Sequence, residues 1–155
     1  MAKFAENTSV AVEKSRGEIE RMVIRYGATS TAFMNAPGRA VIAFDAKNRH
    51  VVFELPLPNI NDKRFDRDGR GSMRNVTKRY EVWEQECRQR WRALALVIKA
   101  KLEAVESGIT NFESEFLAHI RMPDGKTVGE HVTPMIAHAY ETGKMVPLLP
   151  PPRSS

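Results

Sequence analysis

The stretch that decides the fold is residues 77–108, TKRYEVWEQECRQRWRALALVIKAKLEAVESG. Its large apolar side chains and its cysteine recur at intervals of three and four residues, the period of one helix face. They are Tyr80, Trp83, Cys87, Trp91, Leu94, Ile98, Leu102 and Val105. No proline or glycine interrupts the pattern before Gly108, so it predicts one amphipathic helix beginning near Thr77. Such a helix of about 30 residues rises about 45 Å and is expected either to organise the whole domain or to extend into a partner.

Upstream, the sequence predicts an N-terminal helix that ends at Gly27. A capping box starts at Ser15, and Thr8 or Ser9 offers an earlier start. Residues 1–11 are short and polar, and we expect them to form a flexible N-terminus.

Three strands are predicted between the two helices. Thr29–Met34, Arg39–Phe44 and His50–Leu55 are rich in β-branched and aromatic residues and are separated by turn clusters. We expect a short antiparallel meander with Arg39–Phe44 in the centre. It ends at Pro56 and Pro58, because proline has no N–H to donate to a neighbouring strand.

Residues 59–76 break the pattern with dense charge, two glycines and few large apolar side chains. A structureless segment of that length is uncommon in a compact domain unless it is functional or disordered. The sequence therefore predicts a mobile basic loop at 59–76 in the free protein.

Two shorter helices are expected after the long one. A capping box at Thr110 opens the first, and either Thr127 or Thr133 opens the second. The predicted fold class is α+β, with one domain over residues 12–143 and an extended Pro-rich tail over residues 144–155. That tail either docks in a groove of another protein or packs back on the domain.

Charge is unevenly distributed. The 155 residues carry 24 Lys and Arg against 19 Asp and Glu, a net charge of +5, but twelve of these cations and only five of these carboxylates lie in residues 63–101. On the predicted long helix, Arg88, Arg92 and Lys99 share one flank of the apolar stripe, and Arg79, Arg90 and Lys101 share the other. A local excess of arginine favours phosphate groups as ligands, and nucleic acid first among them.

We therefore predict a nucleic-acid-binding surface on this segment. Its expected phosphate contacts are Arg88, Arg92 and Lys99, with Arg64, Arg67, Arg70 and Arg74 closing over the strand, and Phe65 is the expected base-stacking aromatic. Two other interpretations are open: the cations pair with nearby carboxylates, or they bind an acidic protein. Trp83 and Trp91 could also stack on bases, but their place in the apolar stripe favours the core.

No motif in the sequence indicates catalysis, a cofactor or a metal. Four histidines and one cysteine do not make a recognisable zinc-ligand set, and there is no phosphate-binding glycine loop or nucleophile elbow. We expect no catalytic residues, no metal and no cofactor, with a hydrolase that has an unrecognised site as the remaining alternative. The sequence has no apolar run long enough to span a membrane and no secretory signal, and its single cysteine fits a reducing cytoplasm.

Several segments resemble a family of small uncharacterised basic proteins common in phage and prophage genomes. They are Ser15–Glu20 (SRGEIE), Glu54–Pro58 (ELPLP), Arg88–Leu94 (RQRWRAL), Val97–Glu103 (VIKAKLE) and Tyr140–Gly143 (YETG). The resemblance implies a phage gene expressed in a bacterial cytoplasm and carries over no activity. The predicted order of one helix, three strands and one helix also resembles the double-stranded-RNA-binding domain, by element order alone.

The resulting hypothesis is a sequence-independent nucleic-acid-binding phage protein that supports single-strand binding or annealing, DNA being favoured over RNA. The alternative is an interaction protein that inhibits a host defence or nucleic-acid-processing factor. Open sheet edges and a long helix also predict a homo-oligomer, as a ring or a filament along nucleic acid.

Overall fold

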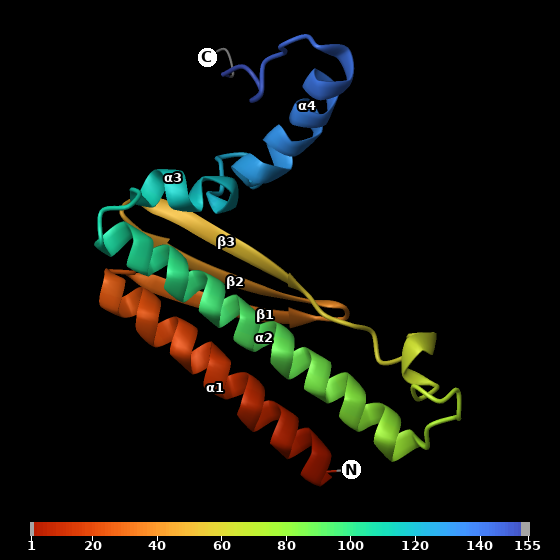
Figure 1. Cartoon of the computed structure of the whole chain (residues 1–155). Helices are drawn as coiled ribbons and strands as arrows, with labels where there is room; N and C mark the ends of the chain where they lie inside the picture. The colour runs from red at the N-terminus through yellow and green to blue at the C-terminus, as the bar shows by residue number, and fades with distance from the viewer. Residues whose placement is uncertain (1, 153–155) are drawn as a thin grey trace.

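The computed structural model describes residues 2–152, and their side chains from residue 12 onward. The expected α+β class is confirmed. In chain order the elements are α1 (Ala2–Tyr26), β1 (Ser30–Ala36), β2 (Arg39–Ala46), β3 (Arg49–Pro56), the 3-10 turn η1 (Lys63–Phe65), α2 (Val76–Glu106), α3 (Phe112–Phe116), the 3-10 turn η2 (Leu117–His119) and α4 (Val128–Thr142). Helices α1 and α2 run side by side over one face of the sheet (Figure 1).

Helix α2 is the central packing element that the sequence pattern indicates. It begins slightly earlier than predicted, because Asn75 and not Thr77 caps it. The Asn75 side chain accepts a hydrogen bond from the N–H of Lys78, in the first turn, at 2.7 Å. The middle of its apolar stripe is buried: Cys87, Trp91, Leu94, Ile98 and Leu102 all belong to this set.

The sheet is an antiparallel meander in the order β1-β2-β3, as predicted, with β2 in the centre. Both connections are two-residue turns; the second, Lys47–Asn48, has positive φ at both residues, as a type I′ turn requires. Phe33, Ile42 and Phe53 lie opposite one another in the register and face the helices.

Helix α1 begins at Ala2, so the predicted starts at Ser15, Thr8 and Ser9 are wrong. Ser15 is 9% exposed and lies inside the helix, where its side chain packs toward α2 rather than capping a terminus. The predicted flexible N-terminus covers residues 1–11, whose side chains are not described. Its flexibility stays a prediction.

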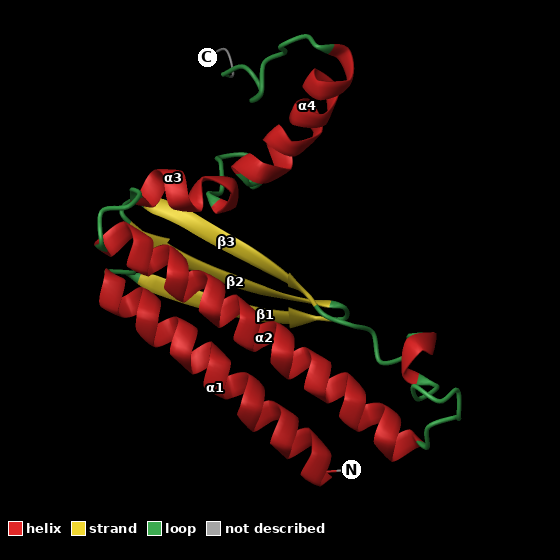
Figure 2. Ribbon diagram, in the orientation of Figure 1, coloured by secondary structure: helices red, strands yellow, loops and turns green. Residues whose placement is uncertain are grey.

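The segment between β3 and α2 has local structure, including the 3-10 turn η1 (Figure 2), whereas its mobility in the free protein stays a prediction. Its short polar side chains satisfy the main chain: Asp68 accepts from the N–H groups of Arg70 and Ser72 at 2.8 and 3.0 Å. Phe65, 2% exposed, holds the loop against the body of the protein. The charge density of the segment gives no sign of these local hydrogen bonds or of the buried Phe65.

The two predicted C-terminal helices are present but play different parts. Helix α3 closes one end of the core, and Phe116 packs edge-to-face on Phe44 and Phe53. Helix α4 opens with a capping box at Thr127, and it projects from the body (Figure 1) with no buried residue. The tail that follows has no helix or strand over residues 144–152.

Candidate nucleic-acid interface

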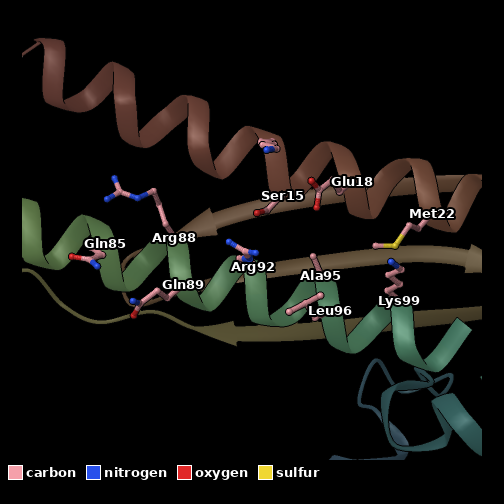
Figure 3. A pocket seen from close by; sticks show the side chains of 11 residues that line it. Ser15, Glu18, Met22, Gln85, Arg88, Gln89, Arg92, Ala95, Leu96 and Lys99 are labelled. Atoms are coloured by element: carbon pink, nitrogen blue, oxygen red, sulfur yellow. The ribbon is translucent and has the colours of Figure 1, made fainter. Parts of the chain in front are cut away.

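A groove of about 570 Å³ runs between α1 and α2 (Figure 3). Four of the residues that line it are cations: Lys14 from α1 and Arg88, Arg92 and Lys99 from α2. Among the described residues that line it, Glu18 is the one carboxylate. Cations therefore outnumber carboxylates among the described residues of the groove.

The spacing of these residues on α2 explains why they meet. Arg88, Arg92 and Lys99 follow one another at four and seven residues, which keeps them on the flank of α2 that faces α1. From Arg88 to Lys99 the helix rises about 16 Å. The predicted grouping of these three cations is therefore confirmed.

The two flanks of α2 differ in how their cations are paired. On the flank away from α1, Arg79 lies 3.3 Å from Asp66, Arg90 lies 3.4 Å from Glu86, and Lys101 lies 3.4 Å from Glu115. On the groove flank, Arg92 and Lys99 make no ion pair within the described residues. Intramolecular pairing, the open alternative for these cations, thus describes the outer flank and, in the groove, Arg88 but not Arg92 or Lys99.

Arg88 is the groove cation with an acidic neighbour of its own. Its Nη1 atom lies 3.9 Å from Oε2 of Glu84, a carboxylate that is 3% exposed. Burial raises the pKa of Glu84, and this effect is opposed by the charge of Arg88 and by a hydrogen bond from Tyr80. At 3.9 Å the pair is too long for a hydrogen bond, so Arg88 keeps its donors available to a ligand.

The four loop arginines, Arg64, Arg67, Arg70 and Arg74, do not line this groove. Arg64 instead donates to Glu86, at 2.8 Å, on the opposite flank of α2. Arg67 and Arg74 donate to main-chain carbonyl groups of the loop itself, and Arg70 is exposed. The structure therefore does not bring the loop arginines together with the groove cations, because the folded loop packs on the other side of the helix.

Phe65 is not available for stacking on a base in this structure. Its ring is buried, and the guanidinium of Arg64 lies 4.6 Å from the ring centroid. A lone large apolar residue in a charged loop is thus an anchor here, which corrects the expected role. Lys14, Gln85 and Gln89 also line the groove and were not predicted. Helical spacing on α2 could have found the two glutamines, whereas only the packing of α1 against α2 brings in Lys14.

The other polar clusters in the described part of the chain do not form a recognisable catalytic site. On the open face of the sheet, Asp45 accepts from Ser30 and contacts His50, and these two interactions hold the pKa of Asp45 below its usual value. The carboxylate stands between the hydroxyl and the imidazole, whereas acyl transfer needs the imidazole next to the hydroxyl. Burial raises the pKa of the Cys87 thiol to about 11, so little thiolate forms at neutral pH.

Among the described residues, no three His, Cys, Asp or Glu side chains are grouped so that they could hold a metal ion. None of the described helices is long and apolar enough to cross a membrane. The fold and the groove define a two-layer α+β protein with a basic groove between two paired helices. Neither the models of known protein families, nor curated proteins, nor solved structures match this chain.

Proposed function

We propose that the protein binds nucleic acid without sequence preference, through the groove between α1 and α2, and performs no chemistry of its own. The observation that carries the proposal is the set of groove cations, Lys14, Arg88, Arg92 and Lys99, with Glu18 as the one carboxylate among the described lining residues. The planar guanidinium of arginine suits bidentate contact with phosphate oxygens.

The shape of the interface favours a single strand. The major groove of a DNA duplex is about 12 Å wide and admits one helix of about 10 Å diameter, so the paired α1 and α2 are too wide to enter together. A flexible single strand can instead lie between the helices. Gln85 and Gln89 line the groove and offer amide donors and acceptors to sugars and bases, and Met22 and Leu96 offer apolar contact.

We place this activity in the cytoplasm of a bacterium that carries a phage, where single-strand binding or annealing supports replication or recombination. DNA is the favoured ligand. The support for this setting is the sequence resemblance to small phage proteins described above.

The salt dependence of binding tests the proposal. Each phosphate neutralised on a single strand contributes about −0.7 to the slope of log K against log salt, so four groove cations predict a slope of about −2.8. Fluorescence anisotropy with labelled single-stranded and duplex DNA and RNA, titrated from roughly 50 mM salt upward, measures it. Absence of binding to all four ligands at the lowest salt contradicts the proposal.

A second candidate, inhibition of a host protein, is favoured by α4. This helix projects from the body, and the side chains of Ile136 and Tyr140 are 45% and 88% exposed. Such apolar exposure on a helix is typical of surfaces that bind protein partners. The expected result is capture of a host protein from lysate that survives nuclease treatment and is lost in the Ile136→Asp, Tyr140→Ala variant. Capture that disappears on nuclease treatment favours nucleic-acid binding instead.

A further inference from the structure

The two edges of the sheet are protected to different degrees. Edge strand β3 carries Arg49, Glu54 and Pro56, and next to its start the carbonyl of His50 accepts from the N–H of Arg121 at 2.8 Å. Edge strand β1, STAFMNA, carries no charged residue and no proline, and no described segment other than β2 pairs with it. Natural proteins usually block an open edge with charge, proline or a covering segment. The β1 edge has none of these.

The register shows which main-chain groups of β1 are free. Ala36 and Arg39 flank the two-residue turn and form a hydrogen-bonded pair. Along an antiparallel ladder such pairs alternate with pairs that exchange no hydrogen bonds. Thr31, Phe33 and Asn35 therefore direct their N–H and C=O groups away from β2. These three residues form a short ladder that is ready to accept another strand.

We propose that β1 pairs antiparallel with β1 of a second copy of this chain, centred on Phe33, so that two sheets join into one of six strands. In this register Thr31 lies opposite Asn35 of the second copy, and Ala32 lies opposite its Met34. Polar faces polar, and the small alanine faces the large methionine, which is 47% exposed in the single chain. An uncharged strand also meets its own copy without like-charge repulsion.

The layer of helices is compatible with this pairing. The guanidinium of Arg16 lies 4.9 Å from the centroid of the Phe33 ring, so α1 passes directly over the middle of β1. Two-fold pairing about Phe33 then brings the two α1 helices next to each other on the same side of the joined sheet. Ile24 of α1 is 53% exposed in the single chain and gains cover from a neighbouring helix.

The pairing also places both basic grooves on one face of the dimer. Each α1–α2 groove lies on the helix side of its sheet, and antiparallel pairing through like edges keeps the two helix layers on the same side. The dimer itself does not depend on nucleic-acid binding. If nucleic acid binds, the joined face offers twice the number of phosphate contacts.

Cysteine cross-linking tests the register. Ala32 and Met34 of the second copy form a pair without mutual hydrogen bonds, with Cα atoms about 4.5 Å apart, which is within disulfide range. Mixing the Ala32→Cys and Met34→Cys variants, one carrying a mass tag, is expected to give mainly the mixed cross-linked dimer under mild oxidation. Each variant alone is expected to cross-link several-fold less, and Val52→Cys on β3 serves as the control. Equal cross-linking in all samples overturns the proposed register.

Sedimentation of the untagged protein, without nucleic acid, tests the dimer itself. We expect a dimer that Phe33→Glu weakens by about tenfold, because two carboxylates then face each other at the centre. Because Phe33 also packs against the core, circular dichroism must show that this variant is folded. A monomeric mass for the unaltered chain up to about 100 μM overturns the proposal.

Discussion

In the Arg88→Ala, Arg92→Ala variant, affinity for single-stranded DNA is expected to fall about 30- to 150-fold. The two guanidinium groups line the groove from α2, with Lys99 further along the same helix (Figure 3). Each charge-assisted contact with phosphate contributes on the order of 1–1.5 kcal/mol. The salt slope should fall from about −2.8 to about −1.4, because two fewer counterions are released. Fluorescence anisotropy at several salt concentrations measures both quantities.

Two control variants separate charge from folding. Arg90→Ala removes a cation from the opposite flank, where Arg90 already contacts Glu86 and the carbonyl of Pro56, so binding should stay nearly unchanged. Arg88→Lys with Arg92→Lys keeps the charge and should retain the slope while losing the bidentate geometry. Because Arg88→Ala also deprives the buried Glu84 of its neighbouring cation, circular dichroism must show that the variant is folded. A slope that is the same in the alanine variant and the unaltered protein contradicts the assignment of this groove.

The elements of the fold could be predicted from local pattern because each is decided by nearby residues. The stripe from Cys87 to Leu102 has helical spacing over many turns, and the strands alternate between turn clusters whose chemistry is evident. The start of α1 was not predictable in this way. Ser15 fits a cap by sequence, and only the packing of α1 against α2 shows that it lies inside a helix.

In the candidate site, too, local spacing predicts some features and contacts between distant residues decide the others. Helical periodicity alone assigns Arg88, Arg92 and Lys99 to one flank, and the structure confirms it. Whether a cation is paired depends on residues far along the chain: Arg64 meets Glu86 because the loop folds back on α2. For the same reason Phe65 could not be recognised as an anchor from its charged neighbours.

Trp91→Ala is expected to lower the free energy of unfolding by about 3–5 kcal/mol, the usual cost of removing a large buried aromatic. The Trp91 side chain is 2% exposed and belongs to the core cluster that joins α1, the sheet and α2. Total stabilities of about 5–15 kcal/mol are normal for domains, so this change removes a large part of the total. For a chain of this size the expected fall in Tm is about 10–15 °C. Urea and thermal unfolding followed by circular dichroism measure these changes.

Trp83→Phe is the control for Trp91→Ala, because it changes the other tryptophan of α2 at a half-buried position. Trp83 is half-buried near the start of α2, and its Nε1–H donates to the carbonyl of Pro58 at 2.8 Å. Its replacement removes one hydrogen bond and should cost only about 1 kcal/mol. If Trp91 stacks on bases instead, Trp91→Ala weakens binding to single-stranded DNA and leaves the unfolding transition in place, which contradicts its assignment to the core. We expect Trp91→Ala to lose stability and to keep its salt slope when binding is measured below the lowered Tm. That result identifies the groove cations, rather than this indole, as the contact with nucleic acid.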